Sequence, residues 1–167
     1  MNNKPSGFTL IELVIVIVVL GILAVTAMPR LINLQADARI AALNGLKGGM
    51  QSAADMVYPI AIKEGLTSVS STTISIEGDP VSIAYGYPAA FSRQTWSKLI
   101  EATFADAIHN SNDPADWYFH NPGGGDEDNS IRFMPKSRIK PSDNCYLIYS
   151  EATETDVPHF EFVTSGC

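Results

Sequence analysis

The stretch that decides the fold runs from Gly7 to Met28 and reads GFTLIELVIVIVVLGILAVTAM. Residues 8–28 number 21 and include one charged side chain, Glu12. At about 1.5 Å per residue, a helix of this length spans roughly 30 Å, the thickness of the hydrocarbon core of a bilayer. A lone segment in lipid must satisfy its backbone hydrogen bonds internally, which requires a helix. We therefore predict a transmembrane helix over residues 8–28.

A removable secretory signal peptide is the alternative interpretation of this stretch. Such peptides carry an apolar region of about 7–15 residues, followed by a cleavage site of small residues. Here the apolar run is longer, and the small residue Gly7 precedes the run instead of following it. The sequence therefore favours an apolar segment that stays in the mature protein.

The hexapeptide GFTLIE, from Gly7 to Glu12, resembles the prepilin peptidase site of type IV pilins. The resemblance implies that prepilin peptidase removes the leader, residues 1–7, by cutting between Gly7 and Phe8. It also implies that the new amino terminus, Phe8, is N-methylated and that the apolar helix is retained. In this family the glutamate of the motif acts in filament assembly. We expect Glu12 to pair with the Phe8 amine of its own or an adjacent chain.

The distribution of charge predicts an exported protein that does not bind nucleic acid. The net charge is −7, and loss of residues 1–7 would remove Lys4 and leave −8. An acidic protein without a basic patch is a poor candidate for nucleic-acid binding. Lys4 precedes the apolar stretch and the acidic bulk follows it, so the positive-inside rule leaves the amino terminus in the cytoplasm and carries the rest outward.

The chain has two cysteines, Cys145 and Cys167. They are too far apart for a redox C-x-x-C or a zinc-binding pattern. In an oxidising, exported setting we expect them to form a disulfide. It would close a carboxy-terminal loop and contribute roughly 3 kcal/mol in the chain-entropy model. Two free buried thiols are the alternative, but a chain end that is not tied down tends to fray.

Two residues mark weak points in the predicted apolar helix. Gly21 costs up to about 1 kcal/mol in a helix interior, and Pro29 cannot donate a hydrogen bond to the carbonyl of Val25. We interpret both as helix breakers. A kinked membrane helix is the simpler interpretation. The resemblance to type IV pilins implies further that the segment between them can melt when subunits pack into a filament.

From residue 29 to residue 62 the helix is expected to continue with one apolar face. Pro59 is expected to end or kink it, and Gly65 to stop it. The apolar positions follow steps of three and four residues and should pack on a sheet. They are Ile32, Ala36, Ile40, Leu43, Leu46, Met50, Ala54, Val57 and Ala61.

The remaining residues, 63–167, are predicted to form a globular head. Short alternating or aromatic segments predict strands at 73–77, 81–85, 117–120, 130–134, 145–149 and 160–164. We also predict a turn at residues 78–80 and a helix over 96–108 with Ser92 as its N-cap. An exposed acidic loop is expected at 121–129. The predicted fold class is α+β, a long amino-terminal helix packed on an antiparallel sheet, as the pilin resemblance also implies.

The sequence carries no motif for catalysis or for a cofactor. G-x-S-x-G, P-loop and G-x-G-x-x-G patterns are absent, and no nucleophile, base and oxyanion set is evident. An EF-hand loop begun at Asp126 would need glycine and glutamate where Ile131 and Ser137 stand. The pair His159-x-Glu161 lacks a second ligand pair. We predict no enzyme, no cofactor and no metal site, and leave open whether residues 126–128 bind calcium.

These patterns together predict the major structural subunit of a type IV pilus. Segments 43–50 (LNGLKGGM), 57–63 (VYPIAIK) and 82–90 (SIAYGYPAA) resemble the mannose-sensitive haemagglutinin (MSHA) branch of the family. The resemblance implies a homopolymer that waits in the inner membrane, is extruded by the pilus assembly machinery and attaches outside the cell to glycans or abiotic surfaces. The alternatives are a pseudopilin of a type II secretion system and a membrane-anchored exported enzyme or sugar-binding module.

Overall fold

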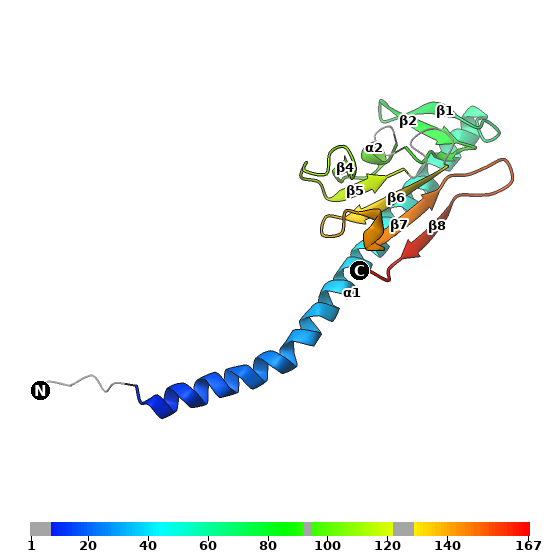
Figure 1. Cartoon of the computed structure of the whole chain (residues 1–167). Helices are drawn as coiled ribbons and strands as arrows, with labels where there is room; N and C mark the ends of the chain where they lie inside the picture. The colour runs from blue at the N-terminus through cyan, green and yellow to red at the C-terminus, as the bar shows by residue number, and fades with distance from the viewer. Residues whose placement is uncertain (1–7, 92–94, 122–128) are drawn as a thin grey trace, which may run out of the picture. The chain divides into compact units, whose positions relative to one another are not determined.

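A computed structural model describes residues 8–91, 95–121 and 129–167, with only the backbone described over residues 27–33. The predicted leader and the acidic residues 126–128 therefore lie outside the described residues. A long amino-terminal helix is followed by a three-stranded and a five-stranded sheet. Figure 1 traces this order along the chain. The predicted α+β class is confirmed.

Helix α1 runs from Leu10 to Glu64. Gly65, with φ of 73°, ends it. The N–H groups of Gly65 and Leu66 donate to the carbonyls of Ile62 and Ala61 over 3.0 and 2.9 Å. This pair of bonds is a Schellman motif, which needs a left-handed residue and so favours glycine. The predicted stop at Gly65 is confirmed.

The helical backbone continues through the predicted breakers Gly21 and Pro29. Pro59 also lies inside the helix, so the prediction that it could end the helix is wrong. The Thr26 hydroxyl donates to the carbonyl of Leu23 over 3.0 Å, which satisfies one main-chain acceptor in this part of the helix. A single glycine costs only about 1 kcal/mol, too little to interrupt a helix of this length.

The chain divides into two compact units, Met1–Ala38 and Arg39–Cys167. In the first unit, the described large apolar side chains from Phe8 to Val25 are 41–80% exposed. None of the helices in the described part of the chain combines the length and the apolar character needed to cross a membrane. The transmembrane segment predicted at 8–28 is therefore not confirmed.

Three short strands in the second unit form an antiparallel sheet in the order β1-β2-β3. Their bounds are β1 Thr72–Ile76, β2 Asp79–Ala84 and β3 Tyr87–Pro88. Glu77 and Gly78 join β1 to β2 with φ of 53° and 96°, the two positive values that a tight type I′ hairpin requires. The turn therefore begins before the predicted 78–80, and Asp79 is already paired with Ile76.

The five-stranded sheet has the order β4-β5-β6-β7-β8, antiparallel except for the parallel pair β4 and β5. The strands are β4 Phe104–Asp106, β5 Trp117–His120, β6 Ser130–Pro135, β7 Tyr146–Ser150 and β8 His159–Val163. A short 3-10 helix, η2 Pro141–Asp143, precedes β7. All six predicted strands are found, with ends within two residues, whereas β3 and β4 were not predicted.

The helix predicted over 96–108 is wrong. Within this range only Trp96, which is π-helical together with Thr95, and α2, Ser97–Leu99, are helical. The chain then enters β4, which pairs with β5. Thr103 and Asp116 fix the start of β4 because the Thr103 N–H and hydroxyl both donate to the Asp116 carboxylate, over 3.0 and 2.7 Å. Sheet pairing therefore outweighs the helical spacing. The predicted cap, Ser92, lies outside the described residues.

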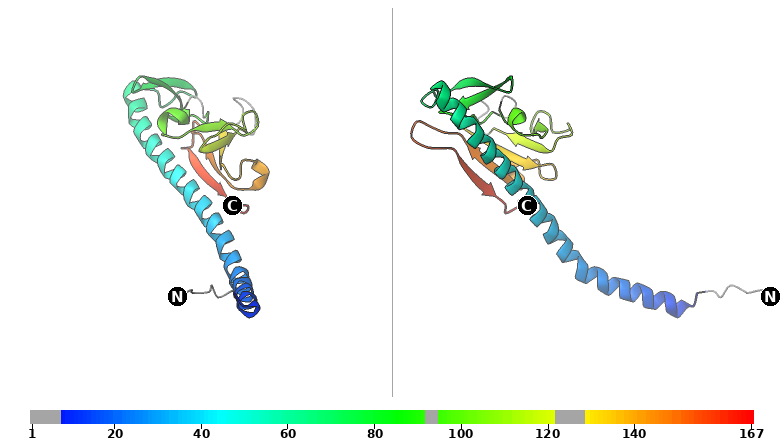
Figure 2. Two further views of the ribbon diagram at one scale, coloured as in Figure 1. Left: turned by 90° about the vertical axis from the view of Figure 1, so that its left-hand side faces the viewer. Right: turned by 180° about the vertical axis from the view of Figure 1, so that it is seen from behind.

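In the unit Arg39–Cys167, the carboxy-terminal half of α1 lies beside the sheets, as Figure 2 shows. Its apolar face packs on them. Leu43, Met50 and Val57 have no exposed surface. One cluster joins this face to Trp96, to Tyr149 and to neighbouring strand residues, and a second joins it to β1 and β2. The predicted stripe is thus confirmed from Leu43 to Ala61. These contacts stabilise the helix far more than helix propensity does.

Candidate functional site

The predicted processing and assembly site lies where α1 begins. Gly7 is outside the described residues, and Phe8 is 79% exposed. The Glu12 carboxylate accepts hydrogen bonds from the Thr9 N–H, over 2.8 Å, and from the Thr9 hydroxyl, over 2.7 Å. The Glu12 N–H donates back to the Thr9 hydroxyl over 3.3 Å. These reciprocal bonds form a capping box.

The capping box shows that Glu12 has a local role that our sequence analysis missed. The signal was present, since Thr9-x-x-Glu12 before an apolar run is the sequence signature of such a box. The carboxylate is held at the first turn of the helix, where the helix dipole also favours a negative charge. Glu12 follows Thr9 by three residues and Phe8, whose amine the cleavage would create, by four residues. The geometry is therefore compatible with both roles.

Beyond the capping box, the described side chains of the first unit form an exposed apolar surface. Its described apolar side chains from Phe8 to Val25 are all exposed, as given above. A contiguous apolar surface of this extent marks a site of interaction with protein or lipid. The predicted breakers Gly21 and Pro29 lie within this helix.

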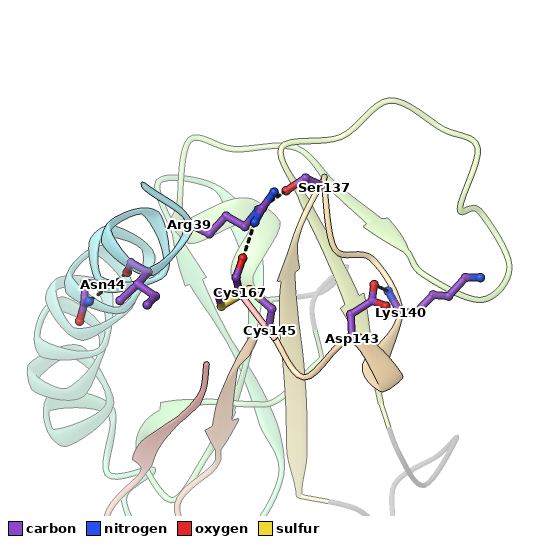
Figure 3. Close-up of a disulfide and its surroundings, with 8 residues drawn as sticks. Arg39, Asn44, Ser137, Lys140, Asp143, Cys145 and Cys167 are labelled. Atoms are coloured by element: carbon purple, nitrogen blue, oxygen red, sulfur yellow. Dashed lines mark hydrogen bonds between the residues drawn. A yellow bond between two sulfur atoms is a disulfide. The ribbon is translucent and has the colours of Figure 1, made fainter. Parts of the chain in front are cut away.

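At the other end of the chain, Cys145 and Cys167 form a disulfide with Cα atoms 4.7 Å apart. Figure 3 shows this bond beside α1. Gly166 lies so close to η2 that a Cβ there would stand 1.8 Å from the main-chain oxygen of Asp143. The Gly166 N–H donates to the carbonyl of Asn144 over 3.0 Å. The carboxy terminus is thus held by the disulfide, by main-chain bonds and by close packing.

Arg39 also holds the carboxy terminus through hydrogen bonds, as Figure 3 shows. Its guanidinium donates to the main-chain oxygen of Cys167 and, over 2.9 Å, to the Ser137 hydroxyl. No signal in the sequence predicts this contact, because the partners are 98 and 128 residues away. Arg39 therefore joins the first turn of the second unit to its last residue.

The metal-binding candidates do not assemble into a site within the described residues. His159 and Glu161 face each other at 3.9 Å on the surface, with both side chains more than half exposed. In the described part of the chain, no group of three histidine, cysteine or acidic side chains comes together. The acidic residues 126–128 lie outside the described residues.

Two aspartates in the head have a lowered pKa. Backbone and hydroxyl hydrogen bonds from Thr103 lower the pKa of Asp116. For Asp106, burial raises the pKa, but hydrogen bonds from the N–H groups of His109 and Ile108 outweigh it. Both carboxylates lie at the ends of β4 and β5 and organise turns. Their hydrogen bonds are therefore structural.

Comparison with known proteins finds a matching motif at the amino terminus. Residues 2–28 match the family model described as a prokaryotic N-terminal methylation motif. The matched residues include the predicted cleavage site and the exposed apolar first part of α1.

Two curated relatives match a longer part of the chain than the motif does. Two proteins of Neisseria gonorrhoeae, each called "Type IV major pilin protein PilE1", are 34% identical to this chain over 87 residues. The match covers 52% of this chain and 51% and 47% of those proteins, so the chain spans about half the length of the curated relatives it matches. No solved structure matches the chain. The predicted resemblance to type IV pilins is confirmed by the motif and by this homology, but the MSHA branch is not supported.

Proposed function

We propose that this chain is the major structural subunit of a type IV pilus and not an enzyme. The observation that carries the proposal is the exposed apolar helix that starts directly after the predicted cut between Gly7 and Phe8. Burial of apolar surface contributes roughly 25 cal/mol per Å², so a long helix with unburied side chains has a strong drive to associate. Helices of many copies, packed side by side, would satisfy that drive.

The proposal includes a maturation sequence that rests on the motif. Prepilin peptidase removes residues 1–7 at the inner membrane, and Phe8 is methylated at its new amine. The pilus assembly machinery then adds the subunit to an extracellular filament. The segment between the predicted breakers Gly21 and Pro29 loses helical structure as the subunits pack.

Glu12 is proposed to set the register between subunits. The amine of Phe8, with a pKa of about 8, stays cationic when methylated. Among packed apolar helices an unpaired charge is strongly disfavoured, whereas a paired one is tolerated. The Glu12 carboxylate would accept a hydrogen bond from the Phe8 amine of its own or an adjacent chain. This bond would either replace the capping bonds from Thr9 or form in addition to them. Pairing with the amine of an adjacent chain selects the register, because a subunit in the wrong register would leave Glu12 without that partner.

The assembled filament is proposed to attach to glycans or abiotic surfaces. Membership of the MSHA branch is a narrower proposal that rests on the segments 43–50, 57–63 and 82–90. The carboxy-terminal loop closed by Cys145 and Cys167 favours a pilus over a pseudopilin of a type II secretion system.

Electron microscopy and mass spectrometry of filaments sheared from cells test this proposal. We expect abundant filaments built from this chain, with a mature amino terminus at methylated Phe8. A chain that keeps Met1 would contradict the processing step. Processed protein confined to the inner membrane, without filaments, would indicate a pseudopilin. Hydrolase or lectin activity without filaments would indicate a membrane-anchored exported enzyme or sugar-binding module.

A further inference from the structure

An open hollow of about 550 Å³ lies in the unit Arg39–Cys167. Its lining comes from α1, from β3, from β8 and from the segment that leads into β8. The volume is within the range of about 300–1,000 Å³ that is usual for small-molecule sites. It involves neither the predicted assembly site nor the disulfide.

The polar side chains in the hollow come from one stretch of α1. Gln51 contributes a carboxamide, Ser52 a hydroxyl and Asp55 a carboxylate. All three residues are exposed. Within the described part of the chain, no hydrogen bond or ion pair engages these three side chains. Burial and the charge of Asp55 raise the pKa of Tyr87, so Asp55 also acts on this lining residue. The three side chains can form hydrogen bonds with a ligand that offers several hydroxyl groups.

Two aromatic rings complete the lining. The Tyr87 ring stacks on Tyr58 with centroids 4.4 Å apart and planes 18° apart, so its orientation is fixed. Gly86 makes this stacking possible, since a Cβ there would lie 3.2 Å from the Tyr58 ring. The second ring, Phe160, packs against Tyr149 with centroids 5.1 Å apart.

The charge of the hollow narrows the choice of ligand. Asp55 supplies a carboxylate, and no lysine, arginine or histidine is among the lining residues. The nearby Lys47 lies over the rings of Phe160 and Phe162, 5.9 and 5.4 Å from their centroids. An anionic ligand would therefore meet an uncompensated carboxylate, which disfavours its binding.

We propose that this hollow binds a neutral sugar residue of a surface glycan. A pyranose has an apolar C–H face, which fits the rings of Tyr87 and Phe160, and a rim of hydroxyl groups. Those hydroxyls donate to the Asp55 carboxylate, in the stronger, charge-assisted kind of hydrogen bond, and exchange hydrogen bonds with Gln51 and Ser52. The inference deepens, and rests on, the proposed function of a surface filament that attaches to glycans.

The glycines of α1 offer a matched pair of variants. Gly48 lines the hollow and Gly45 does not. Both are exposed, and a Cβ at either meets no atom within 4 Å. Leucine is a far better helix former than glycine, so Gly48→Leu and Gly45→Leu should both fold. Only the first should fill the site.

The test is saturation-transfer NMR on the full chain in a non-ionic polyoxyethylene detergent, which carries neither a sugar nor a charge. The probes are neutral methyl glycosides of glucose, galactose and mannose, with N-acetylneuraminic acid and tetramethylammonium as charged competitors. We expect saturable binding of a neutral glycoside to the wild-type chain. Gly48→Leu should weaken it at least about tenfold and Asp55→Asn about tenfold, the value of one charge-assisted hydrogen bond. Gly45→Leu should leave it within about twofold.

Three outcomes would overturn the inference. They are no binding of any neutral glycoside, binding that survives Gly48→Leu, and preferential binding of either charged competitor. Circular dichroism of each variant shows whether it is folded. Because binding is measured on unassembled chains, it does not depend on filament formation. Filaments without glycoside binding would overturn the sugar site alone, whereas binding without filaments would overturn the proposed pilus.

Discussion

The two halves of α1 share one helical backbone but differ in what keeps it helical. In the second unit, Leu43, Met50 and Val57 are fully buried against the sheets. In the first unit, apolar side chains such as Leu20 remain exposed, and the described side-chain hydrogen bonds are local, as between Thr9 and Glu12. Packing normally supplies most of the stability of a helix. The second unit contains its own packing partner, whereas the first requires one from outside.

The largest expected difference between the two halves comes from matched truncations. Leu43→Ala should lower the free energy of unfolding of the head by about 2–5 kcal/mol, because it leaves a cavity in a packed core. Leu20→Ala, at a side chain that is 58% exposed, should change it by less than about 0.5 kcal/mol. Urea denaturation in detergent, followed by tryptophan fluorescence, measures both. Equal losses of stability in the two variants would contradict the proposal that only the second half of α1 depends on packing within the chain.

Loss of the disulfide should lower the stability of the head nearly as much as Leu43→Ala, without affecting the first unit. Replacing Cys145 by Ser is expected to lower the free energy of unfolding by about 2–5 kcal/mol, chiefly by freeing the unfolded chain. Non-reducing peptide mapping of exported protein first establishes that the thiols are paired. Helix content of the first unit, read from hydrogen exchange over residues 10–26, should not change. Free thiols in the exported wild type would contradict the expectation.

Arg39 lies at the start of the second unit and is expected to stabilise that unit. Arg39→Ala should cost about 1–3 kcal/mol, because it leaves the bonds to Cys167 and Ser137 unmade. The exposed neighbouring helix residue Ala38 provides a control, since Ala38→Ser should cost less than about 0.5 kcal/mol. Chemical denaturation compares the two. Similar values would mean that Arg39 does not hold the carboxy terminus.

The smallest expected effect is a dependence of head stability on pH. Hydrogen bonds from Thr103 hold the pKa of Asp116 below its ordinary value. Its contribution is therefore present above about pH 4, near the unfolded pKa, and is lost as the pH falls through the lower folded pKa. Asp116→Asn should reduce stability at pH 7 and flatten its decline below pH 4. Parallel pH profiles for wild type and variant would refute this role.

Sequence periodicity predicted the parts of the fold that depend on local pattern. The buried stripe from Leu43 to Ala61 and six strands were found because burial repeats with the period of each element. The segment 96–108 was misread because its apolar spacing fits a helix, while pairing of β4 with β5 decides its structure. Such pairing is not visible in a local window.

The candidate sites also fall into two groups, those formed by a contiguous motif and those formed by distant segments. The processing hexapeptide and the capping box of Thr9 and Glu12 are contiguous motifs, and both can be read from the sequence. The tie from Arg39 to Cys167 and the hollow lined by Asp55, Tyr87 and Phe160 bring together distant segments. Their residues acquire a common role only once the sheets have placed them.

The most direct test of the central claim is the yield of filaments sheared from cells that produce Glu12→Leu, with immunoblotting for the processed form. We expect complete cleavage after Gly7 and loss or sharp reduction of filaments, because no carboxylate remains to pair with Phe8. Thr9→Val, which removes the hydroxyl hydrogen bond but keeps the carboxylate, should still give filaments. Normal filament yield from fully processed Glu12→Leu protein would contradict the proposed role of Glu12 in assembly.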